Sequence, residues 1–219
     1  MRLLLVFPGV SSPYHPQYIP VYDLLRKECA NRGVEIRVLQ YPGQEGQDGV
    51  VNAETSPESS IDYALKVLDD FEQKSIPYTT LGISYGCNIS MAASLRAKST
   101  SGWQRAIAWA PIPHWKVWAS FGQSRQDDTL AKGTSICKPH TFFYSQSIPN
   151  EYLIQHAPVH LTVAAGSNDR HVGNDYLLYL RSLCREVREQ RKFSFIEGCQ
   201  HNVVAEDPGV DKYINLIFE

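Results

Sequence analysis

The stretch from Tyr78 to Arg96 constrains the fold more than any other part of the sequence. It begins with a short run of apolar and β-branched residues, Tyr78 to Ile83, which is typical of a buried strand. It ends with small and apolar residues, Asn88 to Arg96, in the pattern of a buried helix. Between them lies Gly82-Ile83-Ser84-Tyr85-Gly86, which is G-x-S-x-G in a strand–turn–helix setting. The pattern predicts a sharp turn with Ser84 at its tip.

The two glycines of this motif have a steric purpose. Side chains two residues either side of Ser84 would collide with the neighbouring strand and helix, so both positions need glycine. The turn lifts the Ser84 hydroxyl clear of the sheet and aims the first amides of the helix at the group that this hydroxyl attacks. The alternative is a Gly/Ser turn that only joins strand to helix. An acid and a histidine in the right order would favour the first interpretation.

Two later loops supply that acid and that histidine. Val159 to Ala165 is another buried-strand pattern, and Asp169 follows it. Phe193 to Ile196 is a third, and His201 follows it. The order Ser84, Asp169, His201 therefore places the acid and the base each in a loop just past a strand. This order predicts a triad in which His201 takes the serine proton and Asp169 holds and stabilises the imidazole.

Three other residues compete for these roles. Asp175 is the alternative acid, but it lies where the next helix should begin and is interpreted as an N-terminal helix charge. His171 lies two residues past Asp169 and is interpreted as a loop or pocket residue. Cys87 lies one turn into the helix expected after Ser84. It is expected to be a core residue rather than a nucleophile.

These segments resemble the α/β-hydrolase superfamily, and the resemblance runs from Leu3 to about Phe218 without identifying a subfamily. A further match is the strand that leads into Pro8-Gly9, which resembles the family's strand and His-Gly loop, although Pro8 replaces the usual histidine. The resemblance implies an oxyanion hole formed by the backbone amides of Val10 and Tyr85. It implies no cofactor, because serine, histidine, aspartate and two amides complete the machinery.

Strand and helix patterns alternate at short intervals, which predicts a parallel sheet covered on both faces. Strands are expected near residues 3–7, 34–40, 78–83, 105–110, 159–165 and 193–197. The predicted fold class is α/β: a doubly wound, mostly parallel six-stranded sheet with helices on both faces. Compared with the family that it resembles, this is a minimal version without the usual first antiparallel pair. The length of 219 residues predicts a single domain over residues 1–219.

Residues 111–158 form the one long interval without a clear place in this alternation. A crossover helix is expected near Glu151 to His156, and the aromatic remainder is interpreted as a small lid over the nucleophile. The alternative is that these aromatic residues only pack the excursion onto the body of the protein. The candidate pocket residues, for which surface or packing roles are the alternative, are His15, His114, Trp115 and Trp118.

The charge and hydropathy of the chain exclude several classes of partner. Its net charge is −2, so no overall field draws it to nucleic acid or to an anionic membrane. No apolar run approaches the roughly 20 residues that a membrane-spanning helix needs. Met1 to Pro8 contains only a short apolar run and is expected to be the first core strand rather than a signal peptide.

The five cysteines are odd in number, widely spaced and without a C-x-x-C pair. This pattern predicts reduced thiols and a cytoplasmic protein. Cys199 and His201 could be two ligands of a metal, but no second pair of ligands lies near them in the sequence, so no metal site is expected.

The predicted function is hydrolysis of a small-molecule carboxylic ester or thioester through an acyl-enzyme on Ser84. Two alternatives keep the triad: transfer of the acyl group to an acceptor other than water, and cleavage of an amide or carbon–carbon bond. A rival of another class is a non-catalytic receptor that binds a ligand on this fold. A nucleotide-binding domain is disfavoured because the sequence lacks both G-x-G-x-x-G and a P-loop. The sequence predicts neither the substrate's identity nor the oligomeric state.

Overall fold

A computed structural model describes residues 2–9, 16, 18–42, 57–112, 150–169, 172–187, 190–201 and 203–219. Within these ranges one sheet contains β1 (Leu3–Phe7), β2 (Glu35–Val38), β3 (Tyr78–Ile83), β4 (Trp103–Trp109), β5 (Leu161–Gly166) and β6 (Arg191–Ile196). The strand order is β2-β1-β3-β4-β5-β6, and all neighbouring strands pair in parallel. The predicted six-stranded α/β fold is confirmed, with a described sheet that is wholly parallel.

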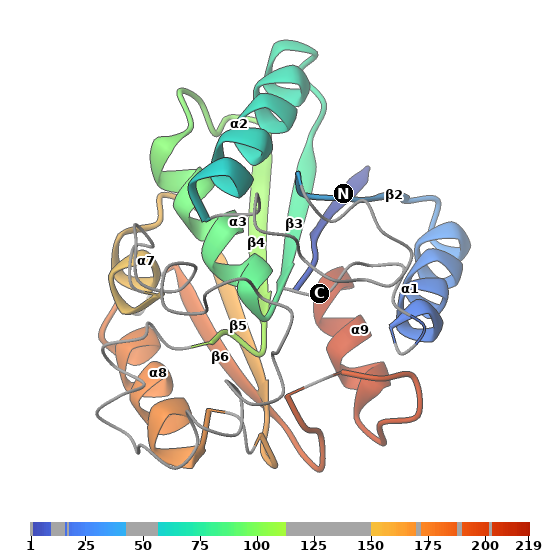
Figure 1. Cartoon of the computed structure of the whole chain (residues 1–219), viewed down its shortest axis with the longest axis vertical. Coiled ribbons are helices and arrows are strands. Elements are labelled where there is room, and N and C mark those ends of the chain that lie inside the picture. Colours follow the sequence, from blue (N-terminus) through green and yellow to red (C-terminus); the bar gives the residue numbers. More distant parts are fainter. Residues whose placement is uncertain are drawn as a thin grey trace.

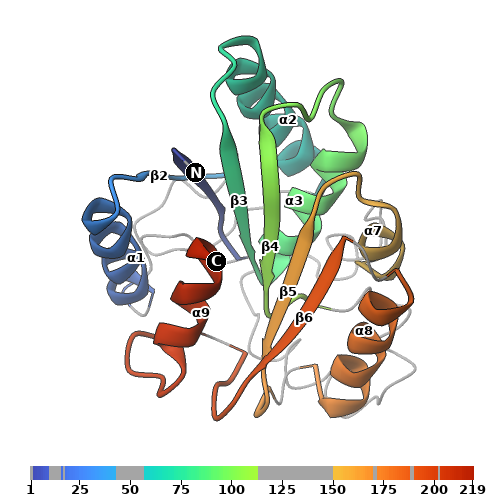
Figure 2. The same ribbon diagram turned by 180° about the vertical axis from the view of Figure 1, so that it is seen from behind.

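The helices cover both faces of the sheet. The helices α2 (Pro57–Gln73), α3 (Tyr85–Arg96), α7 (Asn150–His156) and α8 (Asn174–Glu186) pack on one face (Figure 1). The other face, seen from behind in Figure 2, carries α1 (Ile19–Asn31) and α9 (Val210–Phe218). This doubly wound arrangement gives two hydrophobic cores, one on each side of the sheet.

Strand β1 contributes to both cores and explains why its sequence is apolar without alternation. Leu3, Leu5 and Phe7 face the core on the α2 and α3 side, whereas Leu4 and Val6 face the core on the α1 and α9 side. All five side chains are buried. Full burial of such a side chain contributes about 1.5–3 kcal/mol, so both faces of this strand stabilise the fold.

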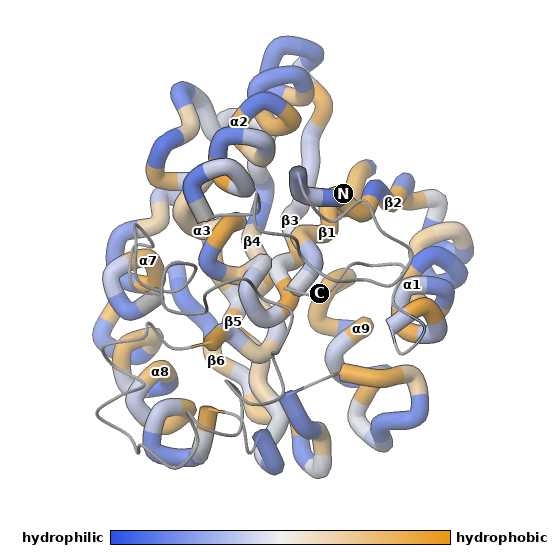
Figure 3. Tube along the Cα trace, viewed as in Figure 1, coloured by the Kyte–Doolittle hydropathy of each residue, from blue (hydrophilic) through white to orange (hydrophobic). Residues whose placement is uncertain are grey.

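The helices α2 and α8 each bury one side, as their sequence periodicity predicts. Along α2 and α8, apolar residues (orange) and polar residues (blue) alternate in bands in Figure 3. In α8 the buried residues are Tyr176, Leu177, Leu180, Leu183 and Cys184. The predicted crossover helix is confirmed as α7, one residue longer at its start than expected.

The order of the strands places a natural site for ligands beside β3. From β1 the chain moves outward to β2, then returns past β1 to β3 and continues to β6 on the other side. Ligands bind at the carboxyl ends of the strands where such a reversal occurs. Ser84 follows the last residue of β3 directly and therefore lies at this position.

Two further findings concern the character of the described residues. None of the helices in this part of the chain is long and apolar enough to cross a lipid bilayer. The four cysteines in this part (Cys29, Cys87, Cys184 and Cys199) are buried free thiols. Burial raises the pKa of Cys29 to about 11 and that of Cys184 to about 12, so both thiols stay protonated at neutral pH.

Candidate active site

Ser84 occupies a strained position between β3 and α3. Its φ of 53° and ψ of −114° lie in a region that L residues rarely adopt, and it is the N-cap of α3. Such a conformation costs about 1–3 kcal/mol and persists only where the surroundings hold it. Here the Ser84 amide donates to the Trp109 carbonyl at 2.8 Å, and the Ser84 carbonyl accepts from the Cys87 amide at 3.1 Å. The turn is thus held from β4 and from its own helix.

The glycines on either side of Ser84 lie where no side chain fits. A Cβ atom on Gly82 would be 2.6 Å from the Cα atom of Cys87 in the helix. A Cβ atom on Gly86 would be 2.0 Å from the carbonyl oxygen of Phe7 at the end of β1. Gly82 therefore lets α3 approach its own strand, and Gly86 lets it approach the neighbouring strand.

The structure brings the three predicted residues into one hydrogen-bonded series. Ser84 Oγ lies 2.9 Å from His201 Nε2, and His201 Nδ1 lies 2.8 Å from Asp169 Oδ2. If the imidazole proton is on Nδ1, where Asp169 accepts it, then Nε2 accepts from the serine hydroxyl. Asp169 is 1% exposed and His201 7%, whereas Ser84 is half-buried. Of the three side chains, the serine is therefore the one most open to a ligand.

Asp169 is fixed by its own loop as well as by the histidine. Its second carboxylate oxygen, Oδ1, accepts from the Val172 amide at 3.2 Å, and its carbonyl accepts from the Gly173 amide at 3.1 Å. A buried carboxylate needs such partners, since an unpaired buried charge is strongly unfavourable. The loop thus orients the carboxylate toward His201 before any ligand is present.

The loop that carries Asp169 and the loop that carries His201 are hydrogen-bonded to each other. The Ser167 amide donates to the Ile196 carbonyl at 3.0 Å, and the Asn168 amide donates to the Cys199 carbonyl at 3.0 Å. In return, the Gly198 amide donates to Ser167 Oγ at 3.0 Å. These reciprocal bonds fix the separation of the acid and the base, and the sequence analysis did not anticipate them.

The predicted oxyanion hole is only partly within the described residues. Tyr85 is the first residue of α3, and its buried side chain donates from Oη to Ser60 Oγ at 3.3 Å. Gly9 packs beside the nucleophile, because a Cβ atom there would be 3.6 Å from Ser84 Cβ. The loop after β1 therefore reaches the predicted site. The predicted residues that lie outside the described part are Val10, His15, His114, Trp115, Trp118 and His171, together with most of the predicted lid.

Two of the three competing residues, Asp175 and Cys87, lie where the sequence predicts. Asp175 is in the first turn of α8, as an N-terminal helix charge. Cys87 is fully buried, and its thiol donates to the carbonyls of Gly82 and Trp109, each at 3.2 Å. Burial also raises the pKa of the Cys87 thiol well above its ordinary value. A protonated, enclosed thiol is a poor nucleophile, so Ser84 is the better candidate.

The residue after β4 has an unusual backbone conformation that the sequence did not predict. Ala110 has a φ of 51°, and its amide donates to the Ala164 carbonyl at 2.7 Å. Two non-glycine residues in the left-handed region, Ser84 and Ala110, therefore follow neighbouring strands. Nothing in the local sequence predicts this for alanine, because the conformation is imposed by pairing with β5.

Cys199 and His201 are two residues apart in the sequence but have different surroundings. Cys199 lies in the core on the α1 and α9 side of the sheet, whereas His201 faces Ser84 and Asp169. In the ranges that the structure describes, no group of three or more His, Cys, Asp or Glu residues could hold a metal ion.

Comparisons with known proteins give structural neighbours only. No family model matches the sequence, and no curated protein matches it. The fold is similar to that of carboxylesterases from the thaumarchaeon Nitrososphaera gargenis, with a TM-score of 0.66 and 13% identity over 99% of this chain and 89% of the other. It is also similar to a formylmaleamic acid deformylase from Pseudomonas putida, with a TM-score of 0.64 and 13% identity over 100% and 92%.

A third neighbour is longer than this chain. It is an uncharacterized protein from Bacillus cereus, with a TM-score of 0.61 and 11% identity. The alignment covers 99% of this chain and 59% of that protein. At these identities the likeness concerns the fold.

Proposed function

Since the chain has the α/β-hydrolase fold, we propose that it is a serine hydrolase that cleaves a carboxylic ester or thioester through an acyl-enzyme on Ser84. One observation carries the proposal. Ser84 lies on a strained turn at the end of β3, where the order of the strands reverses. Its Oγ is 2.9 Å from His201 Nε2, and His201 Nδ1 is 2.8 Å from Oδ2 of the buried Asp169. Strain at a half-buried serine serves no packing purpose, but it presents a nucleophile.

In the first half of the proposed reaction, Ser84 Oγ attacks the substrate's carbonyl carbon while its proton passes to His201 Nε2. The carbonyl π electrons move to the oxygen, which becomes the oxyanion of a tetrahedral intermediate. The backbone amides of Tyr85 and Val10 are proposed to stabilise this charge. When the intermediate collapses, the bond to the leaving alcohol or thiol breaks, and the leaving group takes the proton from Nε2.

In the second half, water takes the place of the serine hydroxyl. His201 Nε2 accepts a proton from the water as its oxygen attacks the acyl carbon of the Ser84 ester. Collapse releases the carboxylic acid and returns the proton to Ser84 Oγ. In both halves Asp169 keeps the Nδ1 proton in place and stabilises the imidazolium that forms.

The experiment that tests the proposal combines a covalent probe with model substrates. A fluorophosphonate should label the wild-type protein, and p-nitrophenyl esters should turn over, since the probe and the esters both need an activated serine. Ser84→Ala should abolish labelling and lower turnover roughly 10⁴-fold or more, with the fold intact. Ser94→Ala is the matched control, because Ser94 is a buried serine of α3 whose hydroxyl donates to the Met91 carbonyl.

The results distinguish the proposal from its rivals. Absence of labelling in folded wild-type protein would favour a non-catalytic receptor. Labelling that persists in Ser84→Ala would remove this serine from the mechanism. Labelling at Ser84 together with turnover of amides but not of esters would retain the triad and replace the proposed bond class.

A further inference from the structure

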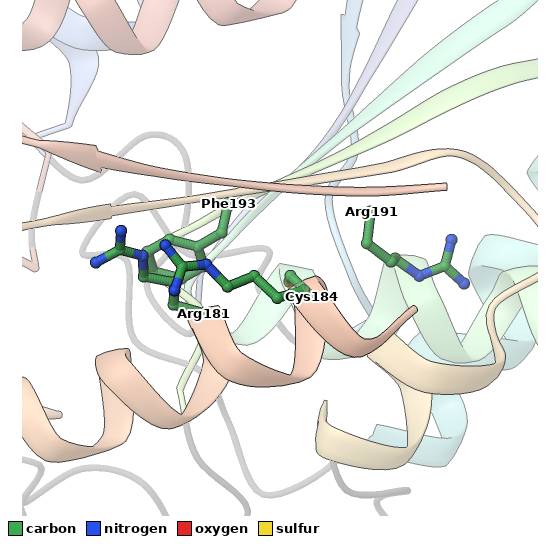
Figure 4. A pocket seen from close by; sticks show the side chains of 5 residues that line it. Arg181, Cys184, Arg191 and Phe193 are labelled. Carbon is green, nitrogen blue, oxygen red and sulfur yellow. The ribbon is translucent and has the colours of Figure 1, made fainter. Parts of the chain in front are cut away.

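A pocket lies between the later half of α8 and the first half of β6 (Figure 4). It is about 460 Å³ in volume and is lined by Arg181, Cys184, Arg185, Arg191 and Phe193. Arg191 is the first residue of β6 and pairs in register with Leu161, the first residue of β5. The pocket is therefore near the amino ends of these strands, whereas Ser84 and His201 follow the carboxyl ends of theirs. It is separate from the candidate active site.

Three of its five lining residues are arginines, and none of them forms an ion pair with a carboxylate in the described part of the chain. Arg181 and Arg185 are four residues apart on α8 and thus lie on the same side of the helix. Like charges at this spacing destabilise a helix unless something neutralises them. An anion held between them would remove this repulsion.

Arg191 has a different position from the other two. The residue is 8% exposed, and its guanidinium donates to the carbonyls of Ile154, Ala157, Val159 and Gln190. In Figure 4 its side chain is at the opposite end of the pocket from Arg181 and Phe193. Arg191 therefore joins β6 to the end of α7 and adds positive potential, but its donors are engaged within the protein.

The apolar part of the pocket is aromatic. Phe193 is half-buried and packs edge-to-face on Phe195, with ring centroids 4.9 Å apart. The guanidinium of Arg181 lies over the Phe195 ring, 5.8 Å from its centroid. An aromatic surface beside two guanidinium groups suits a ligand that carries both a flat apolar group and an anion.

We propose that this pocket binds a small aromatic anion, with its phosphate or carboxylate held by Arg181 and Arg185 and its ring placed against Phe193. Guanidinium groups bind both kinds of anion through paired N–H donors. The site goes beyond the proposed hydrolysis, because none of the residues that line the pocket belongs to the proposed triad.

The test measures the binding of phenyl phosphate and phenylacetate by calorimetry. Inorganic phosphate tests the anionic group alone, and benzyl alcohol tests the aromatic ring alone. We expect saturable binding of at least one aromatic anion, about tenfold or more tighter than the binding of inorganic phosphate or benzyl alcohol. Binding should weaken with rising salt concentration, since the contacts are ionic. No saturable binding of either aromatic anion, or equal binding of inorganic phosphate, would overturn the proposal.

A paired set of variants locates the site. Arg181→Gln with Arg185→Gln should weaken binding at least about tenfold, because glutamine keeps a similar helix propensity and removes both charges. The matched control is Lys27→Gln with Lys98→Gln, which removes the same charge from exposed residues outside α8 and β6. An equal loss in the control pair would overturn the proposal.

Arg185 lies in the last turn of α8, where a positive charge stabilises a helix by itself. If the arginines served only that purpose, the double variant would melt at a lower temperature and bind phenyl phosphate unchanged, which would also overturn the proposal.

Discussion

A Cβ atom on Gly166 would lie 2.1 Å from the carbonyl oxygen of Cys199. Gly166 is the last residue of β5 and opens the loop that carries Asp169, whereas Cys199 is in the loop that carries His201. The missing side chain lets the two loops approach closely enough for the bond between Asn168 and Cys199. The separation of the proposed acid and base therefore depends on a glycine that is not itself one of the proposed catalytic residues.

Gly166→Ala is expected to damage the site as well as the fold. The methyl group must push the two loops apart, at a cost of about 1–3 kcal/mol, and the 2.8 Å contact between His201 and Asp169 should lengthen. The loss of ester turnover should be larger than the loss of folded protein can explain. Parallel measurements of kcat and of urea unfolding would show this difference. Gly33→Ala is the control, since Gly33 has a φ of 65° and space around it. It should cost about 1–2 kcal/mol and leave kcat unchanged.

Ser84→Gly and Ser84→Ala are expected to differ in stability while both lose activity. Glycine adopts the φ of 53° without strain and alanine does not, although glycine loses more conformational entropy on folding. The net difference should leave the glycine variant about 1 kcal/mol more stable than the alanine variant. Thermal or urea unfolding of the two purified variants checks this. An alanine variant that is the more stable of the two would show that the turn is not strained in solution.

The sequence predicted β1, β3 and β5 well because these strands are buried on both faces. Continuous apolar runs such as Leu3 to Phe7, bounded by glycine or proline, leave little alternative to a central parallel strand. The three proposed catalytic residues could be predicted because each lies in the turn or loop that follows a strand. Carboxyl ends of parallel strands meet at one edge of the sheet, so Ser84, Asp169 and His201 had to lie near one another.

Other features could not be predicted, because they depend on contacts between distant segments. The strain at Ala110 comes from its bond to Ala164 on β5, and the role of Gly166 comes from the carbonyl of Cys199. Local sequence shows neither partner. The helix α9 was not predicted either, because it has only nine residues and no side chain that caps its start. Five of its nine residues are nevertheless buried.

Asp169→Asn and Asp175→Asn should separate the two candidate acids. The first is expected to lower kcat by roughly 10³ to 10⁴, because an amide would leave the His201 ring in the wrong tautomer. The second removes a charge from the first turn of α8 and should cost only about 0.3–1 kcal/mol of stability. Ester kinetics and urea unfolding of both variants are the measurements. Reversed effects would make Asp175 the acid.

Glu151 provides a prediction about pH, because its carboxyl is buried near the start of α7. It is 8% exposed, and burial raises its pKa above the ordinary value of 4.5, which a contact with Tyr176 offsets only in part. The native state therefore holds this proton more tightly than the unfolded chain does. Between pH 4.5 and the higher native pKa, the folded protein binds more protons than the unfolded one. The contribution of this group to stability thus falls as the pH rises through that window.

Glu151→Gln keeps the shape of the neutral acid and removes the ionisation. The variant should therefore be more stable than the wild type at neutral pH, by a margin that shrinks as the pH falls toward 4.5. Urea unfolding of both proteins between pH 5 and 8 measures this margin. Glu186→Gln, on the exposed side of α8, is the control and should show little change with pH. A wild type that is the more stable of the two at neutral pH would mean that Glu151 is a charged and well-compensated group.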